Sequence, residues 1–342
     1  MGGISLLKKI YREIRASIWR KSMLWASKSR LFLVLFLILD KQLIWEYVRY
    51  LRGLYKYNRL ERLNSNEYSL RRRLHGIEKG LTQKEFRSEF ALSYILETVM
   101  TLKNLAPCLH EENPSFFEYS LRVLEEYFFR THSDDERYIR AMEIFTELKA
   151  GHAVEKIPEE ERCPNDDSSF FSFLCSRSSI RVFSKEVPSD EVLTYAIRCA
   201  LQAPSGCNRQ PYRFVIIKND KELLKKVAAL PPGGGGNAFD APVVVFVIGD
   251  YSAFPTTRSF HEVYVDSALA SLAFVLALHE QGVDSCFMNW PRDYNLSQRL
   301  ETLLALKPYE TVVTSIALGY REMESRVALS VRKTIEEILE IR

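Results

Sequence analysis

The segment Pro242–Gly249, PVVVFVIG, gives the clearest indication of fold class in this chain of 342 residues. The run is apolar without alternation and rich in β-branched valine and isoleucine, which predicts a strand buried on both faces of a sheet. The segments around it switch repeatedly between strand and helix patterns. Such alternation predicts an α/β or α+β sandwich in which helices cover a sheet.

Strand and helix patterns alternate between residues 189 and 318. The predicted strands cover Tyr212–Lys218, Pro242–Gly249, Asp284–Asn289 and Thr311–Leu318. The predicted helices cover Ser189–Ala203, Lys221–Leu230, His261–Gln281 and Leu296–Leu306. The helix His261–Gln281 is apolar on nearly all sides, so we expect it to be buried or to lie in a subunit interface.

The first part of the chain shows few strand signals. Residues 1–155 are expected to be mostly helical, since Ala91–Leu105 and Phe116–Phe129 carry apolar residues at helical spacing. The polar segment Gly151–Asp167 contains two prolines and predicts a linker. The expected organisation is a helical, basic region over 1–155, a linker over 156–167 and a second domain over 168–342.

Charge is distributed unevenly although the formal net charge is only +3. Residues 1–90 carry 20 Lys and Arg against 8 Asp and Glu, residues 91–170 carry 8 against 17, and residues 171–342 carry 19 against 19. A basic first quarter indicates an anionic partner or docking on the acidic segment that follows it. No zinc-finger spacing, RNP-type strand or clear helix-turn-helix accompanies the charge, so we predict no nucleic-acid partner.

The most apolar stretch is Leu31–Leu39, LFLVLFLIL, which as a helix would cover about 14 Å. A membrane span needs about 20 apolar residues, so this run is too short. No small-residue cleavage site follows it, so a cleaved signal is not expected. Basic residues mixed with Trp and aliphatic residues precede it, as in peripheral membrane helices. We therefore expect residues 1–45 to contact an anionic membrane surface. The protein would then be cytoplasmic and peripheral at the inner face of the membrane. The alternative is that this helix packs on the second domain.

Six cysteines, at positions 108, 163, 175, 199, 207 and 286, contain no CxxC pair. Metal sites and disulfide frameworks normally show tighter or paired spacing. We therefore predict reduced thiols in a cytosolic protein and no metal site.

The segment Cys175–Phe183, CSRSSIRVF, concentrates arginine and serine just before an apolar anchor. Arginine offers a forked donor and serine a short one, which together suit a phosphate or a carbonyl oxygen. The alternative is an ordinary solvated surface. The candidate binding residues are Arg177, Ser178, Ser179 and Arg181.

Two further segments place polar or planar side chains at the ends of predicted elements. In Ala203–Tyr212, Asn208 and Gln210 are two residues apart, so in extended backbone they would face one planar heterocycle; the alternative is that they satisfy their own turn. Gly282–Pro291 ends in side chains suited to a flat ring. The candidate residues are Pro204, Ser205, Asn208, Gln210, Met288, Asn289 and Trp290.

In their order and spacing these motifs are similar to those of the FMN-dependent nitroreductase family, over the second half of the chain. They are Arg177–Phe183, Pro204–Pro211, Asp240–Pro242, Ala317–Tyr320 and the late Arg332. The resemblance implies an α+β, three-layer sandwich of helices around a mixed sheet, preceded here by the mostly helical N-terminal region. It also implies an intertwined homodimer with FMN at the subunit interface.

The resemblance further implies binding roles. Residues matching Arg177, Ser178, Ser179 and Arg181 contact the FMN phosphate, ribityl chain and pyrimidine edge, and the residue matching Arg332 contacts the phosphate. Residues matching Pro204, Ser205, Asn208 and Gln210 reach the flavin from the partner subunit, and the segment matching Phe287–Trp290 covers the ring. The implied reaction is hydride transfer from NAD(P)H through flavin N5 to a small-molecule electron acceptor. It requires no protein acid or base, so we predict no catalytic residue.

Some positions depart from the family pattern. Gly233–Gly236 stands where many members carry Asn and Lys, and we expect Asn237 to keep one of those contacts. Asn289 stands where many members have Glu, and Ser330 where Lys is common. These departures support a rival hypothesis, in which the chain is a degenerate, non-catalytic member acting as an interaction partner in a membrane-associated assembly.

Arg71–Leu81, RRRLHGIEKGL, is the densest polar cluster of the N-terminal region. It resembles an extension of nitroreductase-like proteins linked to surface-polysaccharide synthesis. His75 and Glu78 are expected to share a helix face, with Gly80 as the C-cap. The segment would then contact a phosphate or sugar nucleotide or cover the flavin pocket; the alternative is a capped surface helix with a structural ion pair.

Overall fold

The structure is a computed structural model that describes residues 17–18, 21–39, 41–83, 86–150, 169–228, 230, 241–254, 259–290, 293–323, 325–328 and 330–342. It contains two compact units, one of Met1–Arg59 with Pro255–Phe260 and one of Leu60–Phe254 with His261–Arg342. The predicted linker over 156–167, the loop Gly233–Gly236 and the candidate residue Asn237 lie outside the described residues.

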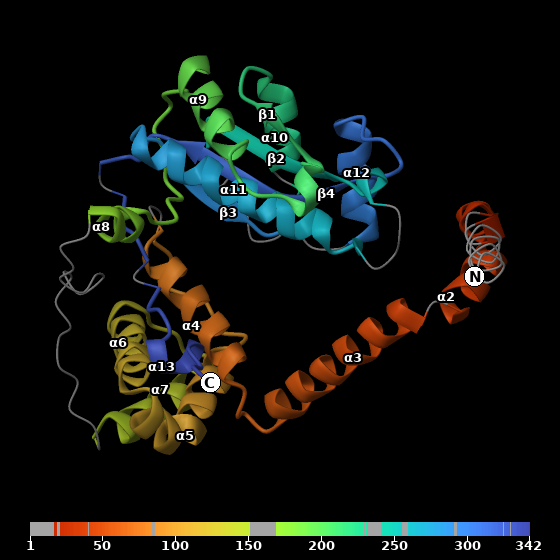
Figure 1. Cartoon of the computed structure of the whole chain (residues 1–342). Helices are drawn as coiled ribbons and strands as arrows, with labels where there is room; N and C mark the ends of the chain where they lie inside the picture. Colours follow the sequence, from red (N-terminus) through yellow and green to blue (C-terminus); the bar gives the residue numbers. More distant parts are fainter. Residues whose placement is uncertain are drawn as a thin grey trace. The chain divides into compact units, whose positions relative to one another are not determined.

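The second unit contains one four-stranded sheet (Figure 1). Its strands are β1 (Tyr212–Ile217), β2 (Val243–Asp250), β3 (Asp284–Met288) and β4 (Glu310–Gly319), in the order β1-β2-β4-β3. All of these strands pair antiparallel. A mixed sheet was expected, but the four strands form an antiparallel one. Parallel pairing among the described residues is limited to an isolated bridge between Ser179 and Ser285, because the 177–181 segment runs beside β3 for a single residue pair.

Helices cover both faces of the sheet, which confirms the predicted α+β sandwich. Alternate residues of β2 point to opposite sides, as the strand period of two requires. Val243, Val245 and Val247 pack in one core with α9 (Asp190–Ala200) and α11 (Glu262–Glu280). Val244, Phe246 and Ile248 pack in a second core with α10 (Lys221–Ala228) and α12 (Tyr294–Leu303).

Helix α11 buries only one side. Ala270, Phe274 and Leu278 lie in the core against the sheet, and the ring of Phe274 is tilted against that of Phe214 with ring centroids 5.0 Å apart. The other side exposes a stripe of apolar side chains at helical spacing, namely Val265, Leu269 and Leu272. Within the described ranges α11 is the helix long and apolar enough to cross a membrane, and half of it is buried inside this unit.

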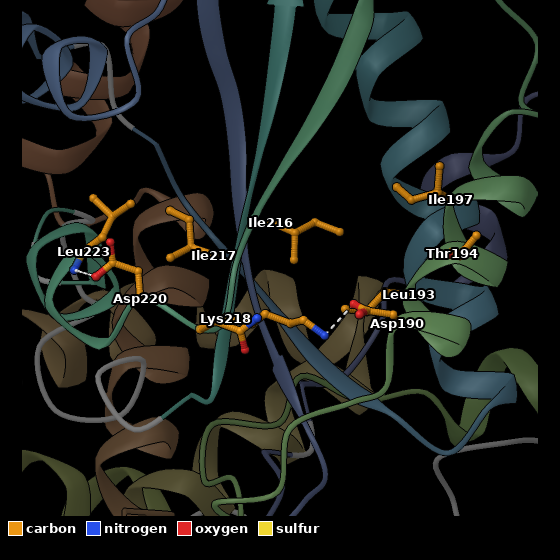
Figure 2. Close-up of a pocket in the computed structure, with 10 residues that line it drawn as sticks. Asp190, Leu193, Thr194, Ile197, Ile216, Ile217, Lys218, Asp220 and Leu223 are labelled. Carbon is orange, nitrogen blue, oxygen red and sulfur yellow. Dashed lines mark hydrogen bonds and ion pairs between the residues drawn. The ribbon is translucent and has the colours of Figure 1, made fainter.

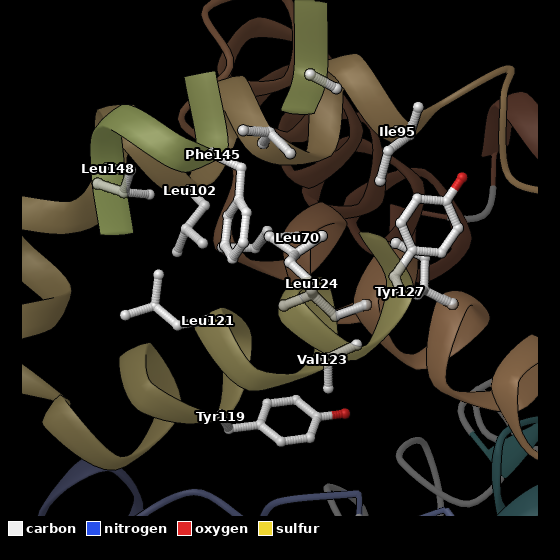
Figure 3. Close-up of a cluster of buried hydrophobic side chains, with 14 of the residues drawn as sticks. Leu70, Ile95, Leu102, Tyr119, Leu121, Val123, Leu124, Tyr127, Phe145 and Leu148 are labelled. Carbon is white, nitrogen blue, oxygen red and sulfur yellow. The ribbon is translucent and has the colours of Figure 1, made fainter. Parts of the chain in front are cut away.

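The region before the sandwich is helical, as expected. Helices α4 (Glu67–Leu81), α5 (Ile95–Glu112), α6 (Pro114–Arg130) and α7 (Glu136–Ala150) enclose a separate core (Figure 3). Tyr127 lies at its centre with no exposed surface, packed edge-on against Phe90 and Phe128. Its hydroxyl donates a hydrogen bond of 2.7 Å to the carbonyl oxygen of Phe90, so the ring is buried without an unpaired polar group.

The 71–81 segment lies in α4, one face of which is buried, since Leu74 and Ile77 have no exposed surface. His75 and Glu78 share a helix face as expected, with Nδ1 of His75 3.6 Å from the Glu78 carboxylate. Gly80 is not the C-cap, since α4 continues past it and Thr82 caps the helix. Gly80 instead allows close packing: a Cβ there would lie 2.3 Å from the ring of Phe90.

The first unit contains α2 (Arg30–Leu39) and most of α3 (Lys41–Arg62). Helix α2 has 10 residues, and its apolar side chains are exposed around the helix; Leu31, Val34 and Ile38 keep more than half of their surface in solvent.

The described part of the chain also contains the short helices α8 (Ser169–Ser176) and α13 (Ile335–Ile338). The expectation of six reduced thiols is wrong at Cys175, which is disulfide-bonded. Cys108, Cys199, Cys207 and Cys286 are free cysteines.

Candidate functional site

The arginine- and serine-rich segment lies beside the start of β3. Ile180 and Phe183 anchor it in the core with almost no exposed surface. The backbone N–H of Ile180 donates to the carbonyl oxygen of Ser285 at 3.1 Å. The candidate residues beside these anchors, Arg177, Ser178, Ser179 and Arg181, are half-buried.

Two pairs of cationic side chains act on each other electrostatically, Arg177 with Arg332 and Lys79 with Arg181. Burial lowers the pKa of Arg177, and the positive charge of Arg332 lowers it further, whereas Cys286 raises it. Burial likewise lowers the pKa of Lys79 on α4, with a further lowering by Arg181 and an opposing effect of Cys286. Effects of this kind require Arg177 to lie within electrostatic reach of Arg332, and Lys79 within reach of Arg181. We call Lys79, Arg177, Arg181 and Arg332 the cationic cluster.

The cationic cluster has no acidic partner in the described part of the chain. Asp284 forms an ion pair with Arg321, whose Nε and Nη2 donate to its carboxylate at 2.8 and 2.9 Å. Glu78 accepts hydrogen bonds from the hydroxyl of Tyr119 at 3.0 Å and from the N–H of Ser330 at 3.2 Å. Like charges held together without a counter-ion disfavour their own charged forms, so the arrangement suits an anionic ligand.

The C-terminal segment brings Arg332 to this place. Ser330 packs against α4, because its backbone N–H donates to the Glu78 carboxylate and its hydroxyl is 3.5 Å from Nδ1 of His75. Val331 packs on the helical core. Seven residues after Ser330, Glu337 accepts from Asn113 at 2.7 Å and pairs with Arg71 at 3.3 Å.

The 204–210 loop differs from the extended backbone predicted for it. Cys207, Asn208 and Gln210 have positive φ of 53°, 57° and 49°, so the chain makes a left-handed turn here. The side-chain amide of Gln210 donates to Oδ1 of Asn208 at 2.9 Å, and its backbone N–H donates to the hydroxyl of Ser205 at 3.2 Å. The amides thus satisfy their own turn, because left-handed backbone does not keep residues two apart on one open face.

The same loop is fixed to α11. The N–H of Gly206 donates to both carboxylate oxygens of buried Asp266, each at 3.1 Å. Pro204, Asn208 and Gln210 remain exposed. Among the described residues no hydrogen bond or ion pair joins this loop to Arg177, Arg181 or Arg332 of the same chain.

Met288 and Trp290 are core residues. Both are buried beside the α10 and α12 side of the sheet, and Trp290 packs edge-on against Phe246 at 6.0 Å. Asn289, which lies between them, is exposed, and so is Phe287, which precedes Met288. The predicted trio is therefore not a side-chain platform, because the strand alternation that exposes Asn289 turns its two neighbours inward.

A cavity of about 490 Å³ lies elsewhere, between α9, β1 and α10 (Figure 2). Its walls are mostly apolar, and Nζ of Lys218 pairs with Asp190 across its edge at 2.6 Å. It contains none of the candidate residues, and its charged side chains are Lys218 and the two aspartates Asp190 and Asp220, so it lacks the positive charge of the cationic cluster.

Lys79 is the member of the cationic cluster that sequence reasoning missed as a binding residue. It lies inside the 71–81 segment, which the sequence did single out for a possible phosphate contact. Its position near Arg181 depends on the packing of α4 and the C-terminal segment, and no local pattern reports such long-range contacts.

The comparisons with known proteins agree with the fold. The nitroreductase family model matches residues 174–232 and 229–320. A protein of Archaeoglobus fulgidus described as an NADH dehydrogenase/NAD(P)H nitroreductase is 30% identical over 154 residues, covering 44% of this chain and 84% of that protein. The iodotyrosine deiodinase of Hydra vulgaris is 25% identical over 209 residues, covering 53% of this chain and 75% of that protein.

A solved structure from Desulfovibrio desulfuricans, described as a nitroreductase in complex with FMN, has 24% identity and a TM-score of 0.43; the match covers 52% of this chain and 98% of that one. The segments that the family model matches, residues 174–232 and 229–320, include the sheet, both helical layers and the arginine- and serine-rich segment. The extent of the Archaeoglobus match and the family-model match together show that the chain belongs to the nitroreductase family.

Proposed function

We propose that this protein binds FMN and transfers hydride from NAD(P)H to a small-molecule electron acceptor. The observation that carries the proposal is the cationic cluster, which lacks a counter-ion and contains three of the residues that match the family's cofactor motifs. When bound, FMN would supply the hydride-accepting N5 atom.

The chain's own residues bind and orient. Arg177 and Arg332 hold the phosphate, since arginine presents a forked donor that matches phosphate oxygens. The guanidinium of Arg181 is held in place by a hydrogen bond of 3.3 Å from its Nη1 to the carbonyl oxygen of Ser179. Ser178 and Ser179 flank these arginines at half-buried positions.

A second copy of the chain completes the proposed site. The exposed stripe of Val265, Leu269 and Leu272 on α11 supports a homodimer, because contiguous apolar surface favours association. The 204–210 loop is attached to the same helix through Asp266. In the dimer this loop reaches the partner's cofactor, which accounts for its lack of contact with the cationic cluster of its own chain.

Purification tests the proposal directly. The protein is expected to be yellow, or to become yellow on loading with FMN, and its flavin absorbance is expected to bleach on anaerobic addition of NADH or NADPH. Reoxidation by candidate acceptors then reports turnover. A colourless protein that cannot be loaded with FMN would contradict the enzyme and support the rival, a non-catalytic partner in a membrane-associated assembly. The link to surface-polysaccharide synthesis rests on the sequence of residues 71–81 alone.

A second proposal concerns the N-terminus. The apolar side chains of α2 are exposed on all sides, and the chain before it is strongly basic. Apolar side chains that enter the headgroup region and cations that pair with anionic lipids are the two requirements of a peripheral helix. Residues 1–45 therefore contact an anionic membrane surface, which would make the protein a cytoplasmic, peripheral membrane protein.

Liposome sedimentation tests this contact. The full chain is expected to sediment with vesicles containing phosphatidylglycerol, less so as salt is raised, and hardly at all with neutral vesicles. A variant lacking residues 1–45 and the double variant Leu31→Glu, Leu35→Glu are expected to stay in solution. Equal sedimentation of all three proteins would refute the proposal.

A further inference from the structure

Asp266 of α11 is a buried carboxylate that binds a backbone group rather than a cation. Only 2% of its surface is exposed. The N–H of Gly206 donates to both of its oxygens at 3.1 Å, and within the described ranges this N–H is its single hydrogen-bond donor. A carboxylate that leaves water for one donor is unfavourable, so its presence on a core helix needs an explanation beyond packing.

The loop that Asp266 binds has a backbone conformation that must be held in place. Cys207, Asn208 and Gln210 have positive φ, which is unfavourable for residues with a Cβ. The bond from the N–H of Gln210 to the hydroxyl of Ser205 lies inside the loop and does not attach it to anything else. Among the described residues, the hydrogen bond to Asp266 is the one that attaches residues 204–210 to another element. Asp266 therefore fixes where the turn lies.

The same turn of α11 also carries the exposed apolar stripe. Val265 precedes Asp266 directly and Leu269 follows it by three residues, and both are exposed. One rigid helical turn therefore holds the loop with its buried side and presents the stripe on its open side. If the stripe lies in the proposed dimer interface, the bond to Asp266 sets the position of the loop relative to the partner subunit.

We propose that Asp266 is a positioning residue of the flavin site: it holds the 204–210 loop in its left-handed turn before the flavin ring of the partner subunit binds. This inference rests on the proposed function, which assigns the loop to that ring. Asp266 acts through the backbone of Gly206. A loop that is already ordered binds more tightly, because the entropy of ordering it is not lost at the moment of binding.

Two variants of the full-length protein separate the hydrogen bond from the charge. Asp266→Asn keeps the size of the side chain and replaces one acceptor oxygen with an amino group, which cannot accept from the N–H of Gly206. Glu262→Gln is the matched control, because Glu262 lies one turn earlier on α11. A Cβ placed on Gly206 would lie 3.7 Å from either carboxylate, yet in the described structure Glu262 accepts no hydrogen bond from the loop.

Dissociation constants are measured by flavin fluorescence for FMN and for riboflavin, which has the same ring and no phosphate. Asp266→Asn is expected to weaken the binding of both about tenfold, equivalent to about 1.4 kcal/mol, because the loop serves the ring. Glu262→Gln leaves both affinities unchanged. Weaker binding of FMN alone would overturn the inference, since Asp266 would then act on the phosphate. Unchanged affinities in Asp266→Asn would overturn it while leaving the proposed function intact.

Hydrogen–deuterium exchange of the flavin-free protein gives a readout that does not depend on the cofactor. Peptides covering residues 204–211 are expected to exchange faster in Asp266→Asn than in Glu262→Gln or the unmodified protein, while peptides from the buried strand β2 stay unchanged. If the full-length protein binds neither flavin, the proposed function fails, and faster exchange of the loop still supports Asp266 as the residue that holds it. Unchanged exchange of the loop, or equally faster exchange of β2, would overturn the inference.

Discussion

Replacing Arg177 with Ala is expected to raise the dissociation constant for FMN about 100-fold, which corresponds to about 2.7 kcal/mol. Arg177 is half-buried beside Arg332 and has no acidic partner among the described residues, so its donors are available to a phosphate. A charged hydrogen bond contributes about 1.5–3 kcal/mol, and a forked arginine can form two. Titration of the apoprotein with FMN, followed by flavin fluorescence, measures the change.

Two further variants define what Arg177 supplies. Arg177→Lys keeps the charge and loses the fork, so we expect an affinity between those of Arg177→Ala and the unmodified protein. Arg198→Ala removes an exposed arginine from the last turn of α9 and is expected to leave FMN affinity unchanged. If Arg177→Ala bound FMN as tightly as Arg198→Ala does, the cationic cluster would not be the phosphate site.

The sandwich could be predicted from sequence because its elements are marked locally. The apolar run at β2 is buried on both faces, and seven of its eight residues have almost no exposure. Ser189 precedes the first turn of α9 and accepts a hydrogen bond from the N–H of Val192, as an N-cap should. Gly282 ends the long helix with a φ of 73°, which glycine adopts without strain. Each of these signals acts within a few residues.

The binding segments could be predicted only as stretches of sequence. Composition marked residues 204–210 and 287–290 as unusual, yet the direction of each side chain depends on backbone geometry that composition does not determine. Positive φ at Asn208 and Gln210 turned two amides toward each other. Strand alternation placed Met288 and Trp290 in the core. The extended backbone assumed for Asn208 and Gln210 is wrong, whereas the cofactor contacts predicted for both segments stay predictions.

The cationic cluster could be assembled only from the structure. Arg177 and Arg181 are neighbours in sequence, whereas Lys79 precedes them by about 100 residues and Arg332 follows them by about 150. Arg332 is held near the helical region because Glu78 binds Ser330 and because Glu337 binds Asn113 and Arg71. Contacts of this separation depend on tertiary packing, which single-sequence periodicity does not report.

The largest effect on stability is expected at the centre of the helical core. Tyr127→Ala should lower the free energy of unfolding by about 3–5 kcal/mol, the usual result of removing a large buried side chain. Tyr127 is fully buried against Phe90, Phe128 and Tyr138, and its hydroxyl is bonded to Phe90. Urea denaturation followed by circular dichroism measures the loss.

Matched variants separate the packing from the hydrogen bond. Tyr127→Phe removes only the hydroxyl and is expected to lose about 1 kcal/mol. Phe129→Ala removes an aromatic ring two residues away on the same helix, where 88% of the side chain is exposed, and should change stability little. Comparable losses for Tyr127→Ala and Phe129→Ala would contradict the buried core that the structure describes.

Tyr127→Ala also tests whether the helical region and the cofactor site depend on each other. The core around Tyr127 includes the leucines of α4, and Glu78 of that helix binds the backbone of Ser330, two residues before Arg332. If this contact positions Arg332 for the proposed phosphate, loosening the core weakens FMN binding while riboflavin binding changes less, and added FMN restores part of the lost stability. Full FMN affinity in a protein whose helical region has melted would show that the sandwich binds the phosphate unaided.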